Sequence, residues 1–98
     1  MTPTQRTLAL MRSKGFYCEV VERHIPHSFI KKDLAGFLDI VCLGDNETIG
    51  IQVTSASNVS ARVKKITEHE NVAAVRKAGW RILVHGWNGS KLREVDLS

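Results

Sequence analysis

Long apolar runs are missing from this chain of 98 residues, and none approaches the ~18 consecutive apolar residues of a membrane helix. The first residues are not followed by the apolar core of a signal peptide, so we expect a cytosolic protein. Cysteine is scarce: Cys18 and Cys42 lie inside apolar runs, which argues against a disulfide framework and predicts two buried free thiols. With 43% hydrophobic and 24% charged residues, the composition excludes disordered, collagen-like and low-complexity classes.

Several catalytic motifs are also absent. The chain has no Gly-rich phosphate loop, no Gly-x-Ser-x-Gly turn and no Cys/His dyad at an interpretable spacing, so a nucleotide cofactor and a nucleophilic enzyme have no support. His24 and His27 have the spacing of a zinc pair, but no third ligand is suitably placed. The net charge of +4 is a modest basic excess, which is compatible with a nucleic-acid partner without identifying one.

The hydropathy pattern predicts one domain with the order helix, three strands, helix, strand. The expected elements are a helix at 4–14, strands at 16–22, 37–43 and 48–54, a helix from Ser57 or Asn58 to about Ala78, a strand at 80–85, and an optional edge strand at 92–97. Residues 44–47 are expected to form a tight hairpin, because Asp and Asn tolerate positive φ. The predicted fold class is α/β, with a mixed sheet of four to five strands flanked by two helices.

Asp39 and Gln52 are polar positions in otherwise apolar strands. If Leu43 pairs with Thr48 across the hairpin, Asp39 lies opposite Gln52, with the two Cβ atoms about 5 Å apart. A carboxylate oxygen and an amide oxygen at this separation can ligate one Mg²⁺ or Mn²⁺, with the Val53 carbonyl and waters as further ligands. The alternative is that Gln52 donates a hydrogen bond to Asp39 and both residues are structural. The spacing leaves both interpretations open.

Asp39, the hairpin and Gln52-Val53-Thr54 on the next strand resemble the PD-(D/E)XK nuclease superfamily. Within it the chain is similar to small phage and prophage proteins related to archaeal-type Holliday-junction resolvases, notably at residues 33–39, 51–55 and 57–62. The resemblance implies a single nuclease domain over residues 1–98 with a restriction-endonuclease-like αβββαβ core. It also implies Mg²⁺- or Mn²⁺-dependent hydrolysis of phosphodiesters in branched or structured DNA by a homodimer.

The same resemblance assigns roles to site residues. Asp39 matches the motif's central aspartate, whereas Gln52 and Thr54 stand where the motif prefers Glu and Lys. Gln52 keeps an oxygen ligand but loses a negative charge, and the Thr54 hydroxyl can orient water but cannot supply a positive charge. Glu22, as a catalytic carboxylate, and Asp33, as a second metal ligand, are candidate substitutes for an acidic residue missing from the first helix. The alternative for both is an ordinary solvated charge.

Four cations are the expected contacts to DNA phosphates. Two lie in the basic loop before Asp33 and two on one flank of the long predicted helix, where His69 is also expected: Lys31, Lys32, Arg62 and Lys65. Arg62 or Lys65 is the candidate replacement for the missing lysine.

Three functions therefore remain open. The first is the metal-dependent nuclease. The second is a DNA-binding module of the same fold that has lost its chemistry through Gln52 and Thr54. The third is a structural or interaction domain in which Asp39 is a satisfied core carboxylate.

Overall fold

The computed structural model describes residues 1–24, 26–27 and 31–98, with Lys31 described by its backbone alone. In chain order the elements are α1 (Pro3–Ser13), β1 (Tyr17–Val20), β2 (Arg23–His24), β3 (Lys31–Lys32), β4 (Ile40–Gly44), β5 (Glu47–Ser55), the 3-10 turn η1 (Ala56–Asn58), α2 (Val59–Thr67), α3 (Val72–Lys77), β6 (Arg81–Asn88) and β7 (Lys91–Asp96). The first helix begins where Thr2 caps it, since the Thr2 hydroxyl accepts from the Gln5 N–H and the Gln5 side chain accepts from the Thr2 N–H.

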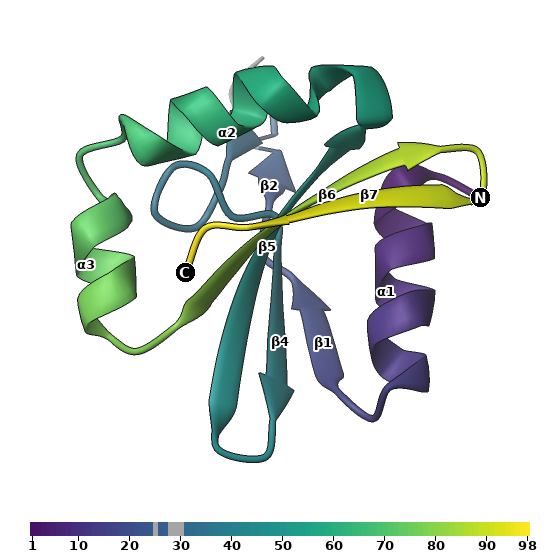
Figure 1. Ribbon diagram of the computed structural model, residues 1–98, viewed down its shortest axis with the longest axis horizontal. Coiled ribbons are helices and arrows are strands. Elements are labelled where there is room, and N and C mark those ends of the chain that lie inside the picture. Colours follow the sequence, from purple (N-terminus) through teal and green to yellow (C-terminus); the bar gives the residue numbers. More distant parts are fainter. Residues whose placement is uncertain (25, 28–30) are drawn as a thin grey trace.

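The main sheet has the order β1-β4-β5-β6-β7 (Figure 1). Its central pair, β5 and β6, is parallel, and the other neighbours are antiparallel. The predicted α/β class and mixed sheet are thus confirmed, and the optional edge strand is β7. Three described helices, rather than the predicted two, accompany the sheet. None of them is long and apolar enough to cross a membrane.

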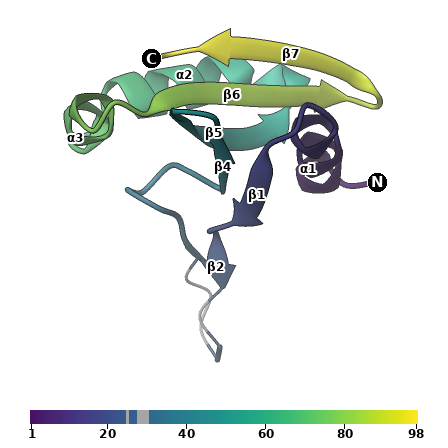
Figure 2. The same cartoon turned by 90° about the horizontal axis from the view of Figure 1, so that it is seen from below.

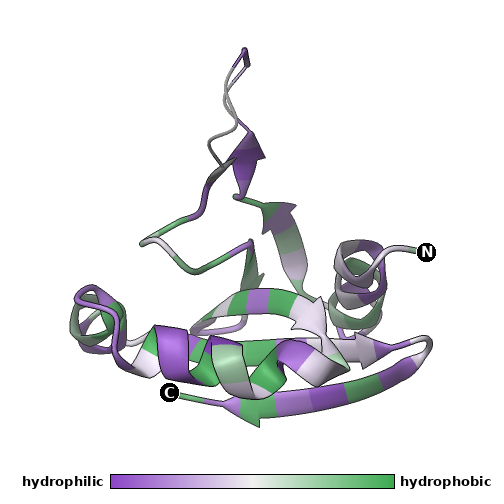
Figure 3. Ribbon diagram, turned by 90° about the horizontal axis from the view of Figure 1, so that it is seen from above, coloured by the Kyte–Doolittle hydropathy of each residue, from purple (hydrophilic) through white to green (hydrophobic). Residues whose placement is uncertain are grey.

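A short ribbon of β2 and β3 stands away from the main sheet (Figure 2), and β2 is hydrophilic (Figure 3). This ribbon lies within the basic loop predicted from the sequence. Positions 25 and 28–30 of that loop lie outside the described residues.

Successive side chains of the strands point to opposite faces of the sheet, and apolar side chains cover both faces. On one face α1 packs over a cluster that includes Met11, Cys18, Cys42 and Leu83. On the other, α2 and α3 pack over a cluster that includes Phe37, Ile66, Val75 and Val84. Both cysteines are buried and free, as predicted.

The predicted hairpin is confirmed, because Leu43 pairs with Thr48 and Asn46 takes a φ of +59°. The second strand begins later than predicted, at Ile40 rather than at position 37. The reason is a closed loop, in which Leu34 and Leu38 exchange backbone hydrogen bonds of 3.0 and 2.9 Å. The Asp39 N–H still donates to the Ile51 carbonyl at 2.9 Å, so the hairpin register extends one residue beyond β4.

The prediction of one long helix up to Ala78 is wrong. The chain leaves the helix after Thr67 and re-enters it at Val72. Tertiary contacts outweigh helix propensity here, because His69 Nδ1 accepts from the Asn71 N–H at 3.0 Å and the Asn71 amide donates to the Ala35 carbonyl at 3.0 Å. Asn58, a predicted N-cap, precedes α2, but its side chain makes no capping hydrogen bond, and the η1 turn leads into the helix.

Candidate functional site

Three carboxylates from separate parts of the chain meet at one place. Glu22 follows β1, Asp33 follows β3 and Asp39 precedes β4, and one oxygen of each lies within 4.8 Å of the others. We call these residues the acidic triad. They lie in a hollow of about 350 Å³, which we call the acidic hollow. Residues singled out from the sequence that line it are Glu22, Asp33, Asp39, Gln52, Thr54 and Arg62.

Asp39 is the most buried member of the triad, with 5% of its surface exposed. Its Oδ2 accepts two hydrogen bonds, from Gln52 Nε2 at 2.9 Å and from the Val53 N–H at 2.8 Å. Burial nevertheless raises the pKa of Asp39 to about 6 and outweighs the two donors, which lower it, while Glu22 and Asp33 raise it further. The Asp39 carboxylate therefore carries its charge in an environment that opposes it.

Only one of the two polar atoms of the Gln52 side-chain amide has a hydrogen-bond partner among the described residues. Its side chain is 3% exposed, and its Nε2 donates to Asp39. Its Oε1 is buried and has no hydrogen-bond partner among the described residues. A buried acceptor without a donor costs about 1–3 kcal/mol. The direct Gln52–Asp39 hydrogen bond belongs to the structural alternative, but that alternative does not account for the unpartnered oxygen.

The closed loop 34–38 sets the separation of Asp33 and Asp39, which flank it. Its reversal requires left-handed backbone, with φ of +59° at Ala35 and +91° at Gly36. The His69 ring lies against this loop, because a Cβ on Gly36 would meet His69 Nε2 at 2.6 Å. Any side chain at position 36 would therefore both strain the backbone and displace His69.

The α2–α3 junction holds the same loop from outside. The His69 ring packs edge-on against Phe37 at a centroid distance of 5.2 Å, and Asn71 bonds to the Ala35 carbonyl. The prediction that His69 lies on a charged flank with Arg62 and Lys65 is therefore wrong. Sequence reasoning gave no role to Asn71, and its only signal was an Asn within an otherwise helical pattern.

The predicted cations are not all in one place. Arg62 is half-buried and lines the acidic hollow, whereas Lys65 is exposed and does not line it. Lys32 is exposed in β3 next to Asp33, and the side chain of Lys31 lies outside what the structure describes. Pro3 and Thr4, from the first turn of α1, also line the hollow. Among the predicted cations whose side chains the structure describes, Arg62 alone lines it.

Comparison with known proteins finds no matching family model, no similar curated protein and no similar solved structure.

Proposed function

We propose that this chain is a divalent-metal-dependent nuclease that hydrolyses phosphodiesters in branched or structured DNA. The observation that carries the proposal is the acidic triad together with the unpartnered Gln52 Oε1 in the same hollow. Carboxylates packed this closely repel one another, and a shared cation relieves the repulsion. A ligand set made only of oxygen atoms fits Mg²⁺ or Mn²⁺ better than the metals that prefer thiolate or imidazole.

The arrangement of elements supports a restriction-endonuclease-like core, as the resemblance to the PD-(D/E)XK superfamily implies. A helix precedes the antiparallel strands β1, β4 and β5, with the β2–β3 ribbon inserted between β1 and β4. A helical crossover then leads to β6, which is parallel to β5. In the sequence resemblance, Asp39, just before β4, and Gln52, on β5, correspond to the motif's metal ligands.

Each residue of the acidic hollow has a distinct role in this proposal. Asp39, Asp33, Glu22 and the Gln52 Oε1 would hold a Mg²⁺ or Mn²⁺ ion, which would supply charge to polarise the scissile phosphate, lower the pKa of the attacking water and stabilise the leaving oxygen. The Asp39 carboxylate is in its ionised form, the form that binds a cation, above about pH 6. The buried Thr54 hydroxyl positions water, and Arg62 supplies the positive charge that the motif's lysine provides elsewhere.

The DNA lies across the acidic hollow in this proposal. Lys32 and Lys65 contact phosphates on either side of the cleaved bond, so binding weakens steeply with salt. Symmetric cutting of paired strands at a junction needs two sites, which favours a homodimer.

A second candidate function rests on a specific observation. The Gln52–Asp39 hydrogen bond forms without a cation, and position 54 has no lysine. Both features suit a DNA-binding module of the same fold that has lost its chemistry. This alternative predicts DNA binding without cleavage and without a metal requirement.

The decisive experiment measures cleavage of labelled single-stranded, duplex, flap and four-way substrates with Mg²⁺ or Mn²⁺. It compares wild type with Asp39→Asn and with the control Asp45→Asn, which removes an exposed turn carboxylate outside the hollow. We expect wild type and Asp45→Asn to cleave, and Asp39→Asn to be inactive but folded. Mn²⁺ binding by calorimetry should follow the same pattern.

The other outcomes separate the alternatives. Binding of DNA without cleavage by wild type would favour the binding module. Absence of both DNA binding and metal binding would leave the structural domain.

A further inference from the structure

A second hollow lies beside the acidic hollow, at the end of β6. Its volume is about 260 Å³, and it is lined by Ser55, Ala56, Ser57, Trp87 and Asn88. We call it the Trp87 hollow. Ser55 lines both hollows, and Ser55 pairs with Trp87 in the parallel β5–β6 ladder. A ligand that occupies the acidic hollow therefore has the Trp87 hollow as its immediate neighbour.

The lining of the Trp87 hollow is aromatic and polar but carries no charge. Half-buried Trp87 lines the hollow, and its indole Nε1 donates to Thr7 Oγ1 at 2.9 Å, which orients the ring. The hydroxyls of Ser55 and Ser57 lie 3.2 Å apart, and Asn88 adds an amide with both a donor and an acceptor. A flat, neutral ring with hydrogen-bonding edges matches this set, whereas a phosphate matches the Arg62 side of the acidic hollow.

Size points to one ring system rather than a whole ligand. Pockets for complete small molecules begin at roughly 300 Å³, so the Trp87 hollow is suited to part of a larger molecule. Exposed Lys91 is the β7 partner of Asn88 and adds a cation next to the hollow. A polymer that alternates negative charges with flat, neutral rings would fit both the neutral hollow and the neighbouring cation.

We propose that the Trp87 hollow binds an unpaired nucleobase of the DNA, next to the phosphate held in the acidic hollow. This inference rests on the proposed nuclease function and narrows its substrate class. A base inside a duplex is stacked on both faces and cannot stack on a protein ring, so the nucleotide beside the scissile phosphate must be single-stranded, flapped or flipped out.

Two tryptophans make the test direct. Trp80 lies apart from this site, beside a different hollow lined by Leu34, Ala35 and α3. In a Trp80→Phe protein all tryptophan fluorescence comes from Trp87, and in a Trp87→Phe protein it comes from Trp80. Each is titrated in EDTA with a short single-stranded oligodeoxynucleotide and with the same sequence as a blunt duplex. We expect the single strand to quench Trp87 and to leave Trp80 unchanged.

Affinity provides the second measurement. Replacing a stacking aromatic weakens single-strand binding by about 5- to 150-fold, so Trp87→Leu should raise the dissociation constant for the single strand by that factor. Its affinity for the blunt duplex should not change. Trp87→Phe keeps a stacking ring but loses the hydrogen bond to Thr7, so it should retain most of the single-strand affinity and controls for damage to the fold.

Three results would overturn the inference. The first is that Trp87 fluorescence stays unchanged while the single strand binds. The second is that Trp87→Leu loses single-strand and duplex affinity equally. The third is a Trp87→Phe protein that binds as weakly as Trp87→Leu. If the protein still cleaves DNA in these cases, only the inference fails. If wild type neither binds nor cleaves DNA, the proposed function fails first.

Discussion

The sheet carries two polar clusters that each include buried side chains, and they differ in how completely these are satisfied. On the α1 face, Trp87 Nε1 donates to Thr7 Oγ1 at 2.9 Å, and Thr7 Oγ1 lies 3.1 Å from His85 Nδ1. Because an indole N–H can only donate, the Thr7 hydroxyl proton is left for His85 Nδ1. His85 Nε2 then carries the ring proton and donates to Glu94 at 2.8 Å. Trp87 Nε1, Thr7 Oγ1 and both ring nitrogens of His85 therefore each have a partner.

The cluster around Asp39 and Gln52 in the acidic hollow is incomplete by contrast. It lies close to the first cluster, because Val53, whose N–H donates to Asp39, pairs with His85 in the β5–β6 ladder. Gln52 Oε1 has no partner among the described residues, and Asp39 is ionised only against the effect of burial. Thr7 and His85 are as buried as Asp39 and Gln52, so it is the missing hydrogen-bond partner that distinguishes a binding site from a structural network here.

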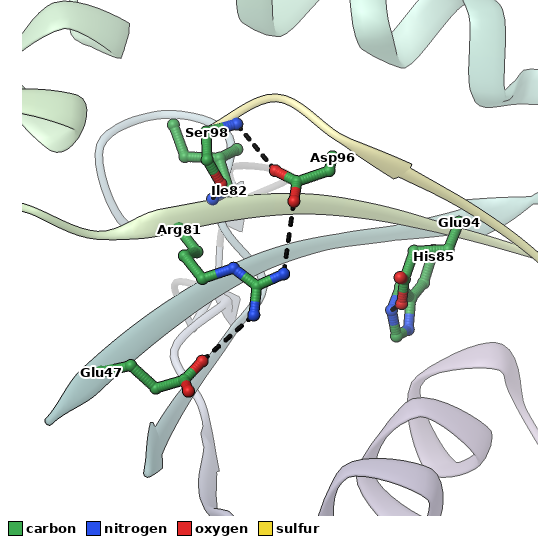
Figure 4. A network of polar contacts seen from close by, with 7 residues as sticks. All are labelled: Glu47, Arg81, Ile82, His85, Glu94, Asp96 and Ser98. Atoms are coloured by element: carbon green, nitrogen blue, oxygen red, sulfur yellow. Dashed lines mark hydrogen bonds and ion pairs between the residues drawn. The ribbon is translucent and has the colours of Figure 1, made fainter. Parts of the chain in front are cut away.

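A network of charged side chains at the surface, around Arg81 at the start of β6, also contrasts with the acidic hollow (Figure 4). Arg81 donates to Glu47 at 3.1 Å and to Asp96 at 3.3 Å. Hydrogen bonds from Ser98, and to a smaller extent Arg81, lower the pKa of Asp96. The side chains of Arg81, Glu47 and Asp96 are substantially exposed, so this network adds little stability. Charges that neutralise one another at the surface do not point to a ligand, whereas like charges gathered in a hollow do.

Removing the Asp39 charge should produce the largest effect. Asp39→Asn keeps an acceptor for Val53 and Gln52 but removes the central ligand, so we expect cleavage to fall by roughly 10³-fold, because the cation supplies several kcal/mol of transition-state stabilisation. Metal-free stability at neutral pH should hold or rise, since a buried charge is lost. Single-turnover cleavage and denaturant unfolding measure the two effects. A variant that unfolds while wild type binds no Mn²⁺ would make Asp39 structural.

Gln52→Glu sharpens the comparison by adding a charge where the amide now bonds to Asp39. Two carboxylates would then face each other in the buried hollow, and the metal-free protein should lose about 3 kcal/mol of unfolding free energy at pH 8. Added Mn²⁺ should restore it, because the cation binds only the folded state. Melting temperatures with and without Mn²⁺ measure both. Unchanged metal-free stability together with unchanged Mn²⁺ affinity would show that positions 39 and 52 do not share a site.

The two clusters should respond to pH with opposite signs. The folded-state pKa of Asp39 is raised from 3.8 to about 6, so the folded state binds more protons in this window, and the unfolding free energy should fall by about 3 kcal/mol in total as pH rises from about 3 to about 7. Burial lowers the pKa of His85, so its contribution is present above about pH 6.5 and is lost as pH falls.

Subtracting the Asp39→Asn stability profile from that of wild type, in EDTA, isolates the Asp39 contribution from the others. We expect a difference that grows from about pH 3 and levels off by about pH 7. A flat difference would mean that Asp39 titrates normally and that the hollow does not oppose its charge.

Thr7→Val tests the satisfied cluster. The substitution keeps the shape of the side chain but leaves Trp87 Nε1 and His85 Nδ1 without their partner, so the unfolding free energy should fall by about 1–3 kcal/mol. Thr7→Ser retains the hydroxyl and serves as the control. Mn²⁺ affinity, measured by calorimetry, should be the same in both variants. A loss of metal binding in Thr7→Val would show that the two clusters are coupled through α1.

Much of the fold could be predicted because its determinants are local. The hairpin register follows from a turn sequence and alternating apolar residues, and it correctly placed Asp39 beside Gln52. Burial of both cysteines follows from their apolar neighbours. The class of the sheet follows from the order of the elements.

The long-range contacts could not be predicted. Nothing local marks Asn71 as the partner of Ala35, and this contact is what ends the predicted helix early. The Thr7–His85 contact joins residues 78 positions apart and is equally invisible in sequence. Glu22 and Asp33 were only candidates, because their meeting with Asp39 depends on a closed loop with two left-handed residues.

Asn71→Ala should have the smallest effect and tests whether the α2–α3 junction acts on the site. Loss of its hydrogen bond to the Ala35 carbonyl should lower the unfolding free energy by about 1 kcal/mol. The loop 34–38 should then hold Asp33 and Asp39 less firmly, and Mn²⁺ affinity should fall by about fivefold, the equivalent of the same free energy.

Asn58→Ala is the matched control, because Asn58 is exposed and its side chain makes no capping hydrogen bond. Calorimetric titration with Mn²⁺ and denaturant unfolding are measured on both proteins. If Asn71→Ala is destabilised but binds Mn²⁺ like Asn58→Ala, the junction stabilises the fold without positioning the triad. If both properties change together, the contact that ends the helix is also part of what makes the acidic hollow a site.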